Sequence, residues 1–137
     1  MQVQARLEQV AEVLANFGLH FLRYLTDPQM NRLQRMALAE ASTSPDMEQA
    51  WWDAGPALTH AALACYFSDP RLRAQLRADA PPALLPTYFI SCIAGEYLCP
   101  APAAAAADGG TLQQQLEARL ALFLRSAARA ASDDRSR

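Results

Sequence analysis

The chain has 137 residues, of which 52% are hydrophobic and 19% charged, so it can bury one core and is too apolar for a disordered chain. Its 12 basic residues, all arginine, and 14 acidic residues give a net charge of -2. The arginines are scattered among acids, which argues against the basic face with which proteins bind DNA. The most apolar region, residues 83–107, is interrupted by prolines and a glutamate, so we expect no membrane span.

The N-terminal residues lack the apolar run of a signal peptide, and the three cysteines contain no CxxC pair. Cys65 and Cys92 fall within apolar helical runs, as buried structural thiols do. We therefore expect a cytoplasmic protein with structural cysteines. A redox use of Cys92 and Cys99 stays open.

The first half of the chain predicts four helices. Apolar residues at alternating steps of four and three predict a helix over residues 2–25. Asp27, followed by proline, starts a second helix to about residue 41, and Ser44, also followed by proline, starts a third. Gly55 and Pro56 interrupt this helix and restart it as a fourth, through about Phe67.

The second half predicts three more helical segments. Asp69 and the proline after it start a short helix with the sequence RLRAQLR. A longer helix lies within residues 81–98, where Pro86 marks either its start or a kink. The prolines and glycines of residues 99–110 predict a loop, whose alanine run is able to form a partial helix. Thr111 and Gln114 have capping-box spacing for a last helix to about residue 131.

These elements predict an all-α fold. No stretch alternates with period two over a useful length, so we expect a helical bundle of about six to seven helices over residues 1–131. The polar residues 132–137 are expected to form a disordered tail.

Catalytic and metal-binding motifs are not found in the sequence. It contains no Gly-rich phosphate loop, no HExxH and no paired Cys/His metal spacing, so we expect no enzyme, no metal and no cofactor. We first interpret His20 as a histidine at the polar edge or in the core, and His60 as a buried histidine whose ring is hydrogen-bonded. His60 also follows the Gly-Pro break and is able to face a cavity. Glu40 and Glu96 lie in apolar surroundings, and a buried acid beside a cleft would favour a small helical enzyme instead.

The aromatic residues allow two interpretations, core packing or an apolar pocket with a few polar groups. Trp51 and Trp52 point about 100° apart on a helix. At most one of them therefore faces a given cavity, and the other lies at an edge or an interface.

Several segments resemble one known family. The sequence RMALAEA at residues 35–41, PDM at 45–47 and Gly55-Pro56 resemble the ligand-binding domain of TetR/AcrR-type transcriptional regulators. Asp79, Phe89, Cys92 and Gly95 resemble that family's "D-D-P … F-x-x-L-x-x-G" helix, with Cys92 where an aliphatic residue is usual. The family's N-terminal helix-turn-helix has no counterpart in this sequence.

The resemblance implies an effector-sensing and dimerisation domain over residues 1–131. In the family the last two long helices pack as a four-helix bundle in a homodimer, and the pocket lies between the helices that match 28–41, 45–67 and 81–98. DNA would be bound only through an N-terminal domain absent from this chain. We expect a small apolar or aromatic effector, with contact area from apolar side chains and orientation by Glu40, His60 or Tyr88.

This hypothesis predicts two sets of residues, one that binds the ligand and one that forms the dimer interface. The predicted ligand-binding residues are Met36, Glu40, Trp51, His60, Phe67, Tyr88 and Phe89. The predicted dimer interface comprises Phe89, Ile93, Tyr97, Leu116, Leu120, Phe123 and Leu124. The alternative hypothesis is a helical protein-interaction or dimerisation module without a ligand pocket.

Overall fold

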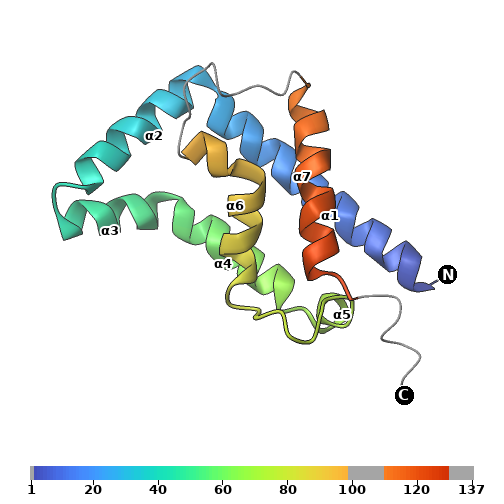
Figure 1. Ribbon diagram of the computed structural model, residues 1–137. Coiled ribbons are helices and arrows are strands. Elements are labelled where there is room, and N and C mark those ends of the chain that lie inside the picture. The colour runs from blue at the N-terminus through green and yellow to red at the C-terminus, as the bar shows by residue number, and fades with distance from the viewer. Residues whose placement is uncertain (1, 99–109, 130–137) are drawn as a thin grey trace.

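The computed structural model describes residues 2–98 and 110–129, which form seven helices (Figure 1). The helices are α1 (Gln2–Thr26), α2 (Pro28–Ala41), α3 (Pro45–Ala54), α4 (Pro56–Phe67), α5 (Pro70–Arg73), α6 (Leu85–Leu98) and α7 (Leu112–Ala127). The predicted all-α fold is confirmed. The expected loop around Cys99 and the expected tail at 132–137 lie outside the described residues.

The helix starts follow from local capping chemistry. The Asp27 carboxylate accepts two backbone N–H groups at 3.0 Å, and the Ser44 hydroxyl and the Asp69 carboxylate each accept one at the start of α3 and α5, again just before a proline. At α7 the Thr111 hydroxyl accepts the Gln114 amide at 3.2 Å, while the Gln114 side chain accepts the Thr111 amide at 2.9 Å. All four predicted starts are confirmed.

Two helices are shorter than their patterns predict, for one shared reason. The expected RLRAQLR helix ends at Arg73, and the last helix ends at Ala127 rather than near 131. The chain leaves both helices to pair backbone with backbone: the Arg77 amide donates to the Ala127 carbonyl and the Arg129 amide to the Gln75 carbonyl, both at 2.9 Å. These tertiary bonds replace helical bonds that the sequence pattern alone favours.

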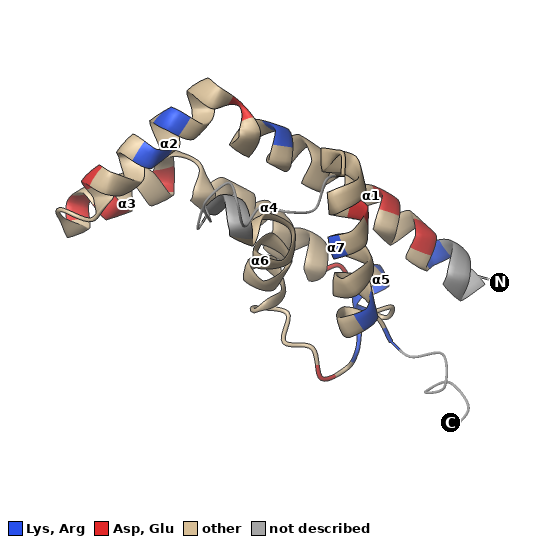
Figure 2. Cartoon of the chain, turned by 45° about the horizontal axis from the view of Figure 1, so that its top comes forward, with Lys and Arg blue, Asp and Glu red and all other residues tan. Residues whose placement is uncertain are grey.

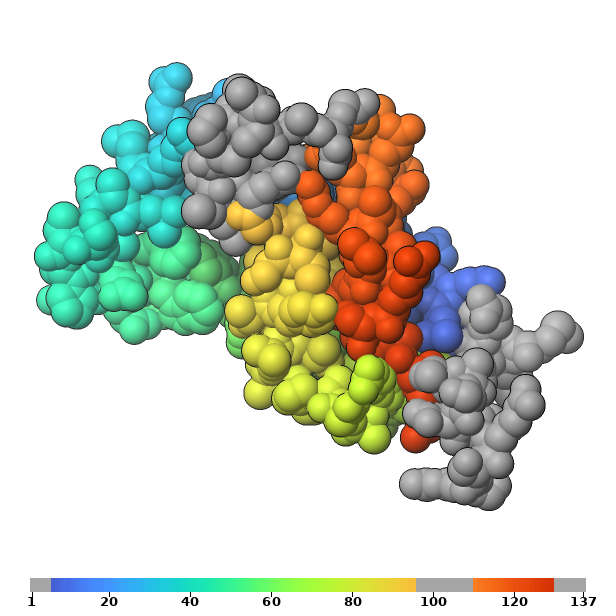
Figure 3. Space-filling model, in the orientation of Figure 1, coloured from blue at the N-terminus to red at the C-terminus, as the bar shows by residue number. Residues whose placement is uncertain are grey.

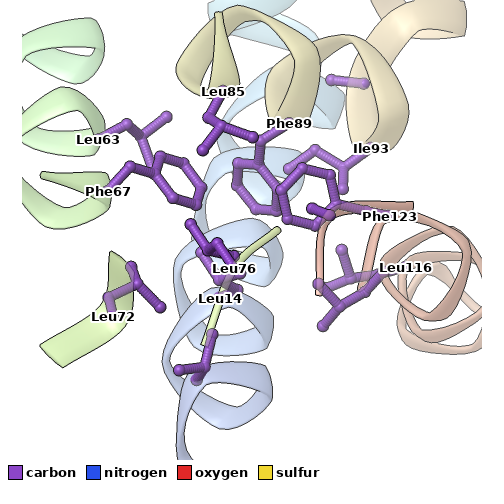
Figure 4. Close-up of a cluster of buried hydrophobic side chains, with 14 of the residues drawn as sticks. Leu14, Leu63, Phe67, Leu72, Leu76, Leu85, Phe89, Ile93, Leu116 and Phe123 are labelled. Carbon is purple, nitrogen blue, oxygen red and sulfur yellow. The ribbon is translucent and has the colours of Figure 1, made fainter. Parts of the chain in front are cut away.

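The core gathers side chains from α1, α4, α6 and α7 around three phenylalanines (Figure 4). Phe67 of α4, Phe89 of α6 and Phe123 of α7 are each fully buried. The Phe89 and Phe123 rings meet edge-on with centroids 5.2 Å apart, and Phe67 lies 6.0 Å from Phe123 and 6.2 Å from Phe89. Helices α4, α6 and α7 therefore each insert one ring into a common cluster, at separations favourable for aromatic pairs.

Helices α2 and α3 form a hairpin that projects from this core, called here the α2–α3 arm (Figure 1). Within residues 28–54 only Ala41 is buried. The arm is attached at its two ends, through α1 and through α4, which begins just after Gly55. It therefore contributes little to the core and keeps most of its apolar side chains exposed.

Helices α1 and α7 cross closely at Gly18. A Cβ atom built there would lie 2.8 Å from the Leu116 side chain and 3.4 Å from that of Ile93. Because real Cβ contacts are longer, a side chain at this position requires its neighbours to move. Glycine thus sets how near α7 approaches α1.

We expect Phe123→Ala to lower the free energy of unfolding by about 3–5 kcal/mol, because it removes the ring at the centre of the core. Leu58→Ala is the control, since Leu58 is 71% exposed and should cost no more than about 0.5 kcal/mol. Urea denaturation followed by circular dichroism measures both. Equal losses in the two variants would contradict the core assignment.

We expect Gly18→Val to lower the free energy of unfolding by about 1–3 kcal/mol, since the branched side chain overpacks the α1–α7 crossing. Gly55→Val is the matched control, because a Cβ there meets no atom within 4 Å. Thermal unfolding of the two variants compares them. A stabilised Gly18→Val variant would show that the crossing of α1 and α7 accommodates a larger side chain without strain.

Candidate functional site

The predicted ligand-binding residues occupy three places in the structure. Met36 and Glu40 are exposed on the α2–α3 arm, and Trp51 is half-buried on it. His60 is half-buried on α4, where its ring lies 5.8 Å from that of Trp52. Three of these residues thus belong to the arm, and His60 belongs to the helix that follows it.

The other three predicted pocket residues lie elsewhere. Phe67 and Phe89 are core residues with no exposed surface, and Tyr88 is on the outer side of α6. The Tyr88 hydroxyl lies 2.8 Å from Ser126 Oγ, which donates its own hydrogen to the Phe123 carbonyl at 2.7 Å. Tyr88 is therefore the donor in the bond that links α6 to α7. The pocket hypothesis therefore rests on Met36, Glu40 and Trp51 of the arm together with His60 of α4.

The arm and the start of α4 present an apolar surface. Its large exposed hydrophobic side chains are Leu33, Met36, Leu38, Met47, Trp52 and Leu58. Contiguous exposed apolar patches mark sites where a ligand or a partner binds, so this part of the molecule is the candidate for such a site.

Two surface clefts lie at the opposite end, between the loop after α5 and the end of α7. One has a volume of about 260 Å³ and is lined mainly by apolar residues of the loop together with Tyr88, and the other has a volume of about 520 Å³ and includes Arg125 and Arg129. Arg77 and Asp79, which border both, form a bidentate ion pair at 2.8–2.9 Å. That hydrogen-bonded pairing lowers the pKa of the Asp79 carboxyl. Of the predicted pocket residues, only Tyr88 lines either cleft.

Most of the predicted interface residues are packed inside a single chain. Tyr97 belongs to α6, but its side chain lies outside the described part of the structure, and Leu124 is half-buried. The remaining five have at most 5% of their surface exposed, namely Phe89, Ile93, Leu116, Leu120 and Phe123. A side chain buried in its own core offers no surface to a second copy, so these five residues are reassigned to the core. Substitution of Leu120 or Phe123 by arginine would accordingly test folding rather than association.

A different side of the same two helices is exposed. Figure 3 shows α6 and α7 side by side at one face, with no other described helix in front of them. We call this surface the α6–α7 face, and it comprises Tyr88, Ser91, Gly95, Gln114, Glu117, Ala118, Ala121, Leu122 and Arg125. The sequence did not separate this face from the core face, because α6 is apolar on nearly all sides. A partial signal was available in α7, where these positions hold alanine and charged residues.

The remaining candidate residues are unremarkable in their surroundings. His20 is exposed, and its ring nitrogen lies 2.9 Å from the carbonyl of Asn16. Glu40 is exposed rather than a buried acid, Cys65 is exposed rather than a buried thiol, and Cys92 is half-buried. The Glu96 side chain lies outside the described residues. Among the described residues, no group of three His, Cys, Asp or Glu side chains is placed to hold a metal ion.

The family comparison agrees with the helical architecture. The chain matches no curated protein and no solved structure. A family model, described as AefR-like transcriptional repressor, C-terminal domain, matches residues 12–125. The chain therefore belongs to the C-terminal domains of TetR-type transcriptional regulators, and within them to the AefR-like family. Such a domain is an effector-binding and dimerisation domain. None of the described helices is long and apolar enough to cross a bilayer.

Tyr66, beside Phe67 at the end of α4, makes the stability of the domain depend on pH in the alkaline range. Burial of the phenol raises its pKa, and the nearby Asp69 carboxylate raises it further. The folded chain therefore favours the neutral phenol more strongly than the unfolded chain does. The resulting stability is fully present below the ordinary tyrosine pKa of about 10 and is lost as the pH rises through the higher pKa of the folded state.

We expect Tyr66→Phe to reduce the loss of stability above about pH 10, because phenylalanine has no proton to lose. Urea denaturation at pH 8 and at about pH 10.5 measures the loss for the wild type and the variant. The wild type should lose more. Equal losses in the two proteins would show that Tyr66 titrates as it does in the unfolded chain.

Proposed function

We propose that the chain is the effector-sensing and dimerisation domain of a TetR-type transcriptional repressor in the cytoplasm, which binds a small apolar or aromatic molecule. DNA would be bound by a helix-turn-helix that this sequence does not contain. The observation that carries the proposal is the family match over residues 12–125, supported by two separate exposed surfaces, the α2–α3 arm and the α6–α7 face.

The effector is proposed to bind where the α2–α3 arm faces α4 and α6. Trp51 on α3 and His60 on α4 are half-buried, and Met36 and Glu40 are exposed on α2 of the arm. Trp51 and Met36 would supply apolar contact area for the effector. The Glu40 carboxylate or the His60 imidazole would orient one polar group of the effector by hydrogen bonding. Phe67 and Phe89 are proposed to support this site from the core rather than to contact the effector.

The arm supports a mechanism of population shift. With Ala41 as its single buried residue, the arm has few contacts that oppose movement relative to the core. Its first helix packs on α1, and α1 also packs on α6 and α7. A ligand that binds one position of the arm more tightly would therefore also favour one arrangement of α1 against α6 and α7.

We expect the neutral fluorophore N-phenyl-1-naphthylamine to bind saturably, and Trp51→Ala and His60→Ala each to weaken binding at least about tenfold. Both residues lie outside the buried core, so the variants should stay folded. Leu84→Ala is the control, because Leu84 is 55% exposed but lies at the opposite end, beside the 260 Å³ cleft. Fluorescence titration measures all four proteins.

The outcomes separate the candidate sites. Loss of binding in the Trp51 and His60 variants alone supports the arm site. Loss in the Leu84 variant alone would move the site to the cleft beside α6. Failure of the wild type to bind this probe and a panel of neutral aromatic compounds would contradict the proposed apolar effector and favour a module without a pocket.

The domain is further proposed to form a homodimer through the α6–α7 face. We expect Leu122→Arg to convert the dimer to a monomer, because it places a charge at an apolar position of that face. Leu58→Arg is a matched control with the same substitution, since the two leucines are 64% and 71% exposed. Multi-angle light scattering gives the mass of each. A wild-type monomer at micromolar concentration would contradict the proposed dimer.

A further inference from the structure

The α6–α7 face is self-complementary about one point. We infer that two copies pack antiparallel along α7 with the two-fold axis at Ala121, so that Glu117 of each copy pairs with Arg125 of the other. The inference rests on the proposed homodimer and specifies how its two copies are aligned.

The charges on α7 support the antiparallel alignment. Glu117 and Arg125 are both exposed, and each lies four residues from Ala121, on opposite sides of it. A two-fold axis through Ala121 therefore brings Glu117 opposite Arg125 at two symmetric places. A parallel alignment would instead oppose like charges, which disfavours association.

These two side chains form no ion pair within the described part of a single chain. The salt bridge described there joins Arg77 to Asp79. The Glu117 carboxylate accepts a hydrogen bond of 3.2 Å from Gln113, one turn earlier on the same exposed surface. Both charges are therefore available to a second copy.

Helix α6 agrees with the same axis. It runs antiparallel to α7 (Figure 1). The hydrogen bond between Tyr88 and Ser126 shows which residues of the two helices lie at the same level. Because the helices are antiparallel, five residues after Tyr88 on α6 and five residues before Ser126 on α7 reach the same level. Ile93 therefore lies level with Ala121. The axis then crosses α6 between Ser91 and Gly95, so Ser91 of one copy opposes Gly95 of the other.

Residue size and charge at the axis favour close packing. Around the axis the exposed or half-buried positions are small, at Ser91, Gly95, Ala118 and Ala121. Residues 85–95 of α6 carry no charge and Glu96 follows directly after them, whereas α7 carries charged residues along the proposed contact (Figure 2). Leu122 is 64% exposed and so supplies apolar area beside the small residues. Small residues let two helix pairs approach, and the charged pair fixes their register.

Cysteine cross-linking tests the position of the axis. In a background in which Cys65, Cys92 and Cys99 are replaced by serine or alanine, we expect Ala121→Cys to form a disulfide-linked dimer under mild oxidation, because residues at a two-fold axis face their own copies. Ala50→Cys is the matched control, being an exposed helical alanine on α3. Non-reducing gel electrophoresis measures the linked fraction, which should be the majority for Ala121→Cys and minor for the control.

Charge exchange tests the pairing. We expect Glu117→Arg and Arg125→Glu each to weaken the dimer at least about tenfold, and the double variant to return to within about threefold of wild type. Sedimentation equilibrium gives the dissociation constants. A wild-type dimer with no Ala121→Cys linkage, or single variants that bind as wild type does, would overturn this register while leaving the dimer intact. A wild type that is monomeric would overturn the dimer itself.

Discussion

The contact on which the rest of the structure depends is the meeting of Phe67, Phe89 and Phe123. Each ring comes from a different helix and each is fully buried. Because each of α4, α6 and α7 buries one phenylalanine in the same cluster, this contact determines which side of each helix is turned toward the core. The outward faces follow from this arrangement, and they are the surfaces left for function.

This constraint divides the domain into two parts with different physical properties. The core, built on α1, α4, α6 and α7, is held by close-packed apolar side chains and by the near approach of α7 to α1 at Gly18. The α2–α3 arm has Ala41 as its single buried residue and keeps its hydrophobic side chains exposed. Rigid support beside a loosely attached apolar element suits a domain that senses one ligand and transmits the result to a partner copy.

Sequence patterns located the helices well, but they did not distinguish the buried sides of α6 and α7 from the exposed sides. Proline after Asp27, Ser44 or Asp69 identifies helix starts because the signal is local, involving one side chain and the next few amides. Phe89 and Phe123 were predicted to belong to a pocket or an interface, but they fill the core. Periodicity shows that a helix side is apolar, whereas it does not show whether its own chain or a second one covers that side.

The sequence by itself determined the all-α class, the capped helix starts and the family, because these depend on neighbouring residues and on motif spacing. The tertiary structure alone decided which apolar side of α6 and α7 meets the core. It also ended α5 and α7 early, through backbone bonds between segments some 50 residues apart. Such choices depend on which surfaces compete for burial when all helices are present, and no local pattern contains that information.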